Sequence, residues 1–95
     1  MVQGISCVRL YDNRLHNYGA ITNHYKDVYV DIEINGEVLG DIRIEQLITD
    51  NYLAIPDKDM QMIIKASKKL VKDKVCNFYI LDFATRNVER YSVDY

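Results

Sequence analysis

A cluster of lysines carries the clearest binding chemistry in this 95-residue sequence. Residues 57–74 hold six lysines against three aspartates, although the whole chain has a net charge of −2. Ammonium groups spaced along one side of a helix can contact successive phosphates of a nucleic acid, with an affinity that falls steeply as salt is added. The same spacing is typical of the solvated side of an amphipathic helix, so both interpretations stay open. The candidate phosphate contacts are Lys58, Lys65, Lys68, Lys69 and Lys72.

Arg9 and Arg43 are two further cationic candidates. Either guanidinium could position a phosphate or the carboxylate of a partner. Both arginines lie in predicted strands beside acidic residues, so cross-strand ion pairs are the competing interpretation.

A second candidate surface is acidic and lies on a predicted β-hairpin. Carboxylates alternate there with apolar residues, which places them together on one face of the sheet. Such a face could bind a basic partner protein or imitate a nucleic acid, and it is also typical of an ordinary solvated sheet face. The side chains would diverge on a flat sheet, whereas a metal ion needs convergent ligands. The acidic residues are Asp27, Asp31, Glu33, Asp41 and Glu45.

The sequence lacks the residue patterns typical of enzymes. His16 and His24 have no serine, cysteine or carboxylate at a spacing that would make a nucleophile–base pair. Cys7 and Cys76 are far apart and have no nearby second cysteine, which argues against a zinc site or a disulfide scaffold. We therefore predict a non-enzymatic protein without a cofactor or a metal ion.

The elements that would position these side chains form one domain over residues 1–95, with an α+β fold. Period-two patterns predict a strand over 88–95 and a hairpin over 26–45 that turns at Asn35-Gly36. We also predict strands over 5–11, over 52–55 before Pro56, and over the nearly continuous apolar run 75–83. A loop over 12–24 and a turn over 46–51 connect them. We expect Val38 to share the face of Ile42 and Ile44, and Gly40 to mark a bulge or a close backbone approach.

One amphipathic helix follows Pro56, and Asp57 is its predicted N-cap. We expect it to pack on a bent antiparallel sheet in the order β-β-β-β-α-β-β, with residues 75–83 covered on both faces. Its predicted buried residues are Met60, Ile63, Ile64, Ser67, Leu70 and Val71.

Three short motifs occur in order along the first half of the chain. They are Val8-Arg9-Leu10 in the first strand, Asp41-Ile42-Arg43-Ile44 in the return strand of the hairpin, and Tyr52-Leu53-Ala54-Ile55-Pro56-Asp57-Lys58 before the helix. In these motifs and their spacing, residues 5–58 resemble the stage V sporulation protein G (SpoVG) family. The chain departs from the family after Pro56, where it enters a helix at once and adds a C-terminal β-hairpin.

The resemblance implies a dimeric regulator that binds DNA or RNA, in a bacterium or its phage. We expect a cytoplasmic location, because the sequence shows no signal peptide. Exposed strand edges and the tyrosines Tyr79, Tyr91 and Tyr95 also favour a homodimer, although strand tyrosines could instead stack on bases. The alternative is a small interaction module or inhibitor that binds a basic host protein through the acidic face. We expect no membrane association, because no apolar run approaches the ~20 residues of a membrane helix.

Overall fold

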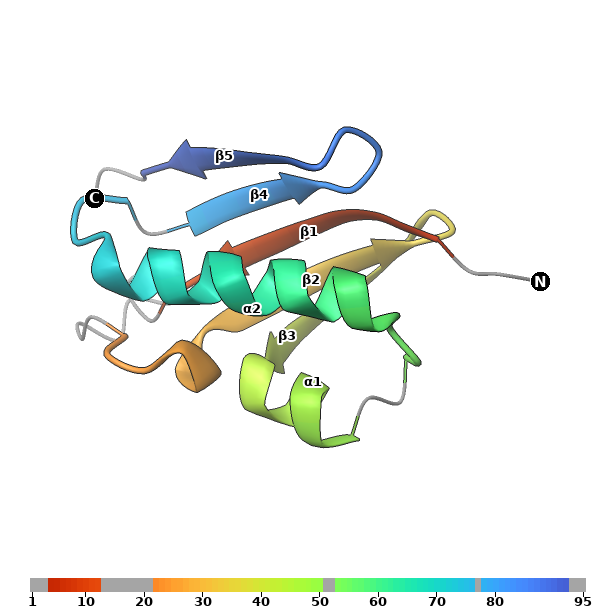
Figure 1. The fold of residues 1–95 in the computed structure, drawn as a ribbon, viewed down its shortest axis with the longest axis horizontal. Helices are drawn as coiled ribbons and strands as arrows, with labels where there is room; N and C mark the ends of the chain where they lie inside the picture. Colours follow the sequence, from red (N-terminus) through yellow and green to blue (C-terminus); the bar gives the residue numbers. More distant parts are fainter. Residues whose placement is uncertain (1–3, 13–21, 51–52, 77, 93–95) are drawn as a thin grey trace.

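The computed structural model describes residues 4–12, 22–50, 53–76 and 78–92. Five strands form one antiparallel sheet in the order β3-β2-β1-β4-β5 (Figure 1). The strands are β1 (Ile5–Tyr11), β2 (Tyr29–Ile34), β3 (Glu37–Arg43), β4 (Phe78–Asp82) and β5 (Asn87–Tyr91). The α+β class and the antiparallel sheet predicted from the sequence are confirmed.

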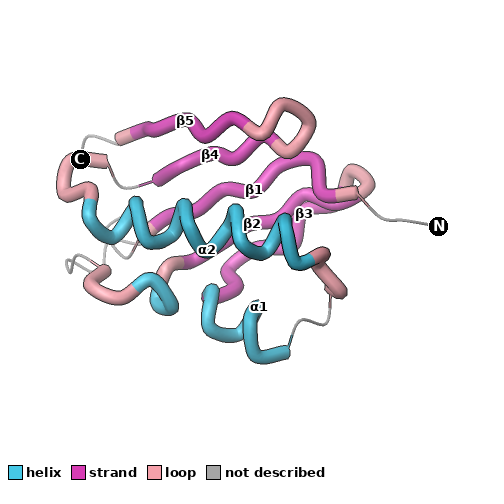
Figure 2. Tube along the Cα trace, viewed as in Figure 1, coloured by secondary structure: helices cyan, strands magenta, loops and turns pink. Residues whose placement is uncertain are grey.

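Two α-helices, α1 (Ile44–Asp50) and α2 (Asp57–Lys72), and a short 3-10 helix, η2 (Tyr25–Asp27), accompany the sheet (Figure 2). Helix α2 runs along the sheet in front of β1 and β2 in the view of Figure 1. Its buried residues Met60, Ile63 and Leu70 belong to the same core as Val8 and Leu81 of the sheet. The core therefore lies between α2 and one face of the sheet.

Helix α1 replaces structure that we predicted as the end of a strand and a turn. Ile44 and Leu47 are fully buried, and Ile48 packs against the same core. This i, i+3, i+4 spacing buries one side of a helix, and it was too short to be recognised in the sequence. The strand predicted over 52–55 is also wrong for residues 53–55, which are not in a strand, while residue 52 lies outside the described residues. The element order is β-β-β-α-α-β-β.

Pro56 is the N-cap of α2, so the prediction that Asp57 caps this helix is wrong. The Pro56 carbonyl accepts bonds from the amides of Asp59 and Met60 at 3.0 and 2.9 Å. Proline suits this position because its fixed φ is compatible with a helix entry and it has no amide to leave unpaired. Asp57 and Asp59 lie in the first turn, where negative charge complements the helix dipole.

The predicted buried side of α2 is confirmed in most positions. Ser67 is buried and its hydroxyl donates to the Ile63 carbonyl at 2.8 Å. Ala66 is buried although we did not predict it, whereas Ile64 and Val71 are only half-buried. β4 is likewise half-covered on its second face, where Phe78 and Ile80 lie, so the prediction of a strand buried on both faces is wrong.

A β-bulge interrupts β3 where Gly40 and Asp41 lie opposite Asp31 of β2. Val30 pairs with Ile42 on one side of the bulge, and Ile32 pairs with Leu39 on the other. The extra residue reverses the alternation of the strand, so Val38 lies opposite Glu33 and is 63% exposed. The bulge at Gly40 is confirmed, and the predicted face of Val38 is wrong because of it.

We expect Gly40→Ala to lower the free energy of unfolding by about 1–2 kcal/mol. A Cβ at this position would lie 2.9 Å from Oδ1 of Asp31. That oxygen accepts bonds from the Tyr11 hydroxyl at 2.8 Å and from the Asp41 amide at 3.0 Å, so it cannot move without breaking them. Urea denaturation measures the change, and Gly4→Ala is the control because nothing lies within 4 Å of its Cβ. Equal stability of both variants would contradict a tight bulge.

Candidate nucleic-acid interface

A groove of about 440 Å³ lies between α2 and the β4–β5 hairpin, and three of the predicted lysines line it. These lysines are Lys58, Lys65 and Lys69, which follow one another along the side of α2 that faces β5. At 1.5 Å per residue they span ~16 Å of the helix. The groove therefore offers a row of positive charge on a rigid element. The other lining residues are Gln61, Met62, Ala66, Arg86 and Val88.

The remaining two helix lysines lie outside this groove. The Lys68 ammonium group lies 5.0 Å from the ring centroid of Tyr25, on the flank of α2 that faces η2. Lys72 is exposed near the C-terminal end of α2 and does not line the groove. The structure thus brings three of the five lysines together in the groove, whereas Lys68 lies on the other flank of α2.

Arg9 and Arg43 lie on the opposite face of the sheet from α2. Val8 and Leu10 are fully buried in the core, so the alternation of β1 turns Arg9 away from the helix. Arg9 lies opposite Asp31 of β2, and Arg43 forms an ion pair with Asp27. We name this side of the sheet the outer face. The structure therefore separates the two arginines from the lysines.

Arg86 lines the groove and was not among the residues that we identified in the sequence. It lies in the turn before β5 with a positive φ of 63°. One of its guanidinium nitrogens lies 2.8 Å from Oδ1 of Asp59, and another donates to Sδ of Met62 at 3.4 Å. No periodic pattern marks a single turn residue, so only the fold brings Arg86 to α2.

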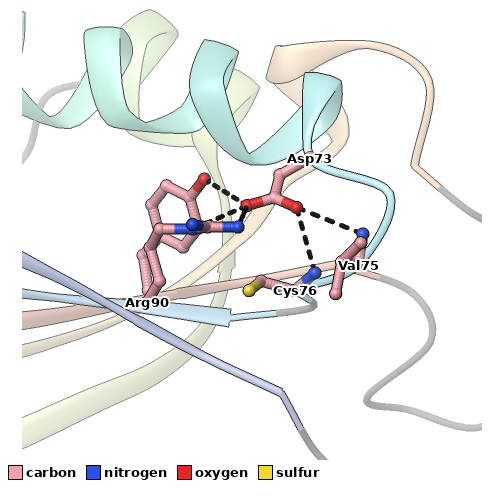
Figure 3. Close-up of polar contacts among 5 residues, drawn as sticks. Asp73, Val75, Cys76 and Arg90 are labelled. Atoms are coloured by element: carbon pink, nitrogen blue, oxygen red, sulfur yellow. Dashed lines mark hydrogen bonds and ion pairs between the residues drawn. The ribbon is translucent and has the colours of Figure 1, made fainter.

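Asp73, directly after α2, joins the helix to the β4–β5 hairpin (Figure 3). Its Oδ1 accepts from the amides of Val75 and Cys76, both at 3.1 Å. Its Oδ2 accepts from Nε of Arg90 at 2.8 Å and from the Tyr79 hydroxyl at 3.0 Å. Burial raises the pKa of this carboxyl, but the donated bonds outweigh it and lower the pKa from 3.8 to about 2. Asp73 is therefore ionised at neutral pH.

The tyrosines that we considered for base stacking have different surroundings. Tyr79 is only 3% exposed, and burial together with its bond to Asp73 raises its pKa to about 12. Tyr91 stacks on Phe78 on the outer face, with ring centroids 5.1 Å apart. Tyr95 lies outside the described residues. Tyr79 is thus a core residue that could not stack on a base, whereas the side chain of Tyr91 is exposed.

The acidic side chains of the outer face are bonded within the protein. The Tyr11 hydroxyl lies 2.8 and 3.0 Å from carboxylate oxygens of Asp31 and Asp41. Burial and these two carboxylates raise the pKa of Tyr11. Glu33 accepts from the Ser6 hydroxyl at 3.1 Å. Glu45 belongs to α1, so its predicted place in the strand is wrong.

His24 has a structural role, and His16 lies outside the described residues. The Nδ1 atom of His24 accepts from the Lys26 amide at 3.2 Å and caps η2. Among the described residues, no group of three or more His, Cys, Asp or Glu side chains could hold a metal ion. None of the described helices is long and apolar enough to cross a membrane.

Comparison with known proteins identifies no relative of this chain. No family model matches its sequence, and no curated protein or solved structure matches it. The groove between α2 and β5 must therefore be interpreted from its own residues.

Proposed function

We propose that this chain is a non-enzymatic nucleic-acid-binding protein whose α2 lysines contact the phosphate backbone. The observation that carries the proposal is the row of Lys58, Lys65 and Lys69 along one groove. None of the three forms an ion pair with another described residue. Their charge therefore remains available to phosphates, and each neutralised phosphate releases bound cations on association.

The resemblance of residues 5–58 to the SpoVG family supports the same proposal and extends it to DNA or RNA bound by a homodimer. The lysine groove lies in α2, after the segment that carries the resemblance. Backbone contacts of this kind position a nucleic acid without reading its sequence. We therefore propose that the groove supplies affinity rather than sequence preference.

The alternative function, a protein-interaction module acting through its acidic face, involves the outer face of the sheet. Ser6, Tyr11 and Arg43 already bond the acidic residues there. The two functions predict different partners. If the groove binds phosphates, the protein should be retained on heparin at low salt, and if the outer face is the interface, the protein should bind a basic protein.

We expect the double substitution Lys65→Glu and Lys69→Glu to weaken binding to a labelled 30-base-pair DNA and the matching RNA about 100-fold at low salt. The logarithmic dependence of affinity on salt should become shallower by about 2, because two phosphate contacts are lost. A gel-shift series at several salt concentrations measures both quantities.

Lys68→Glu combined with Lys72→Glu is the matched control, since it changes the charge of the same helix equally outside the groove. In the gel-shift series at about 0.1 M salt we expect a loss of about tenfold or less from this control, because its charges lie outside the groove and exposed charges are then screened over ~10 Å. Equal losses in both double variants would remove the groove from the proposal, and absence of binding by the unaltered protein would refute it.

A further inference from the structure

The two edges of the sheet differ in their capacity to accept another strand. The ladder of β3 is broken by the bulge at Gly40 and Asp41, and Asp41 has a positive φ of 58°. β5 pairs with β4 without interruption from Asn87 to Tyr91, and all five of its residues are exposed. No described strand pairs with the other edge of β5. Within the part of the chain that the structure describes, β5 thus presents a regular row of edge amide and carbonyl groups without a strand partner, whereas the row on β3 is interrupted by the bulge.

Ion pairs connect the β5 hairpin to α2 at both ends of the groove beside this edge. Arg86 binds Asp59 near the start of α2 at 2.8 Å, and Arg90 binds Asp73 just after its end at 2.6 Å. Between these two contacts the β5 hairpin is separated from α2 by the groove. A preformed site of this kind lowers the entropic cost of binding.

The lining of the groove combines apolar surface with positive charge. Met62, Ala66 and Val88 contribute apolar side chains, and Lys58 and Lys65 stand beside them with Lys69. Val88 is 38% exposed although it lies on the core side of the sheet, opposite buried Leu81. None of the lining residues is aromatic, so the groove has no platform on which a base could stack.

We propose that the groove binds an extended acidic peptide segment of a partner protein, which adds to β5 as a sixth strand. The backbone of the peptide would pair with the free edge of β5, and side chains on its helix side would enter the groove. Aliphatic groups there would lie against Val88 and Met62, and carboxylates would meet the lysines. Addition of a strand beside a helix is an established mode of peptide recognition, in which the edge gives affinity and the groove gives specificity.

The apolar lining of the groove and the free edge of β5 match an extended peptide, and the phosphate contacts proposed above for the lysines use neither feature. A second copy of this chain is the competing occupant of this edge, and the light-scattering measurement below identifies it. The inference goes beyond the proposed nucleic-acid function and does not depend on it.

A ten-residue fluorescein-labelled peptide tests the proposal, with Val and Glu alternating along one face and Thr on the other. We expect it to bind, and a peptide with Lys in place of each Glu to bind at least tenfold more weakly. Binding should slow the hydrogen exchange of the β5 amides and leave that of the β3 amides unchanged. Equal affinity for both peptides, or protection confined to β3, would overturn the proposal.

Two variants distinguish this proposal from the nucleic-acid function. Val88→Thr keeps the charge and the strand preference, so we expect about fivefold weaker peptide binding and unchanged DNA binding. Lys65→Glu with Lys69→Glu should weaken both. Unchanged peptide affinity in Val88→Thr, with thermal stability preserved, would overturn the placement in the groove. A dimeric mass in light scattering without peptide binding would assign the edge to a second copy.

Discussion

Replacing Asp73 with alanine will lower the free energy of unfolding by about 3 kcal/mol. The carboxylate is only 12% exposed and accepts bonds from two amides, a hydroxyl and a guanidinium. Alanine would remove the acceptor of the part-buried Tyr79 hydroxyl and Cys76 amide and of the exposed Val75 amide, and hydrogen bonds to a charged group contribute more than neutral ones. Urea denaturation followed by circular dichroism measures the effect.

Arg90→Ala is the matched control for Asp73→Ala. The Arg90 side chain is 59% exposed, so its loss leaves three of the four bonds to Asp73 in place. We expect this variant to lose about 1 kcal/mol or less, as exposed ion pairs usually do. Equal effects of the two variants would mean that the ion pair, rather than the bonds from the two amides and the hydroxyl, carries the stability.

The contribution of Asp73 should also depend on pH, with a definite sign. Because folding lowers the pKa of this carboxyl from 3.8 to about 2, the folded state favours the ionised form. The stabilisation is fully present above pH ~4 and is lost as the pH falls toward 2. The difference in melting temperature between the unaltered protein and Asp73→Ala should therefore shrink between pH 6 and pH 2.5. A constant difference would contradict the lowered pKa.

Ile63→Ala will lower the free energy of unfolding by about 3 kcal/mol, whereas Ile64→Ala will cost about 1 kcal/mol or less. Both isoleucines lie in the middle of α2, and the sequence predicted both as buried. Ile63 is fully buried in the core between α2 and the sheet, while Ile64 is only half-buried. Alanine at Ile63 would leave a cavity that the sheet cannot fill.

The pair serves as its own control, because the two substitutions remove the same atoms and change helix preference equally. Chemical denaturation of both variants in one buffer gives the difference directly. If Ile64→Ala proved as destabilising as Ile63→Ala, α2 would have to be rotated about its axis so that Ile64 also faces the core.

Strong periodic patterns made much of this fold predictable. The alternation of Val28, Val30 and Ile32, followed by Asn35-Gly36, identified the β2–β3 hairpin, and both turn residues do have positive φ. The 3.6-residue spacing after Pro56 identified α2 and placed its lysines on the exposed side. In these elements a single rule of burial acts over many consecutive residues.

Other features depend on contacts between distant residues and were not predictable in this way. The seven residues of α1 are too few for a reliable period, and they form a helix because Ile44 and Leu47 complete the core. The candidate groove needs Arg86 and Val88 from the last hairpin as well as lysines from α2. Their approach follows from the position of β5 at the end of the sheet, which local sequence does not encode.

The bulge in β3 limits how this protein can assemble. Unlimited growth of a sheet would require both edges to pair with neighbouring molecules, so β3 must pair as well as β5. The bulge at Gly40 and Asp41 interrupts the row of backbone groups along β3, so a strand added there could pair over only a few residues. β5 is therefore the regular edge of this sheet, and the irregular β3 edge opposes the repeated strand pairing that fibre growth requires.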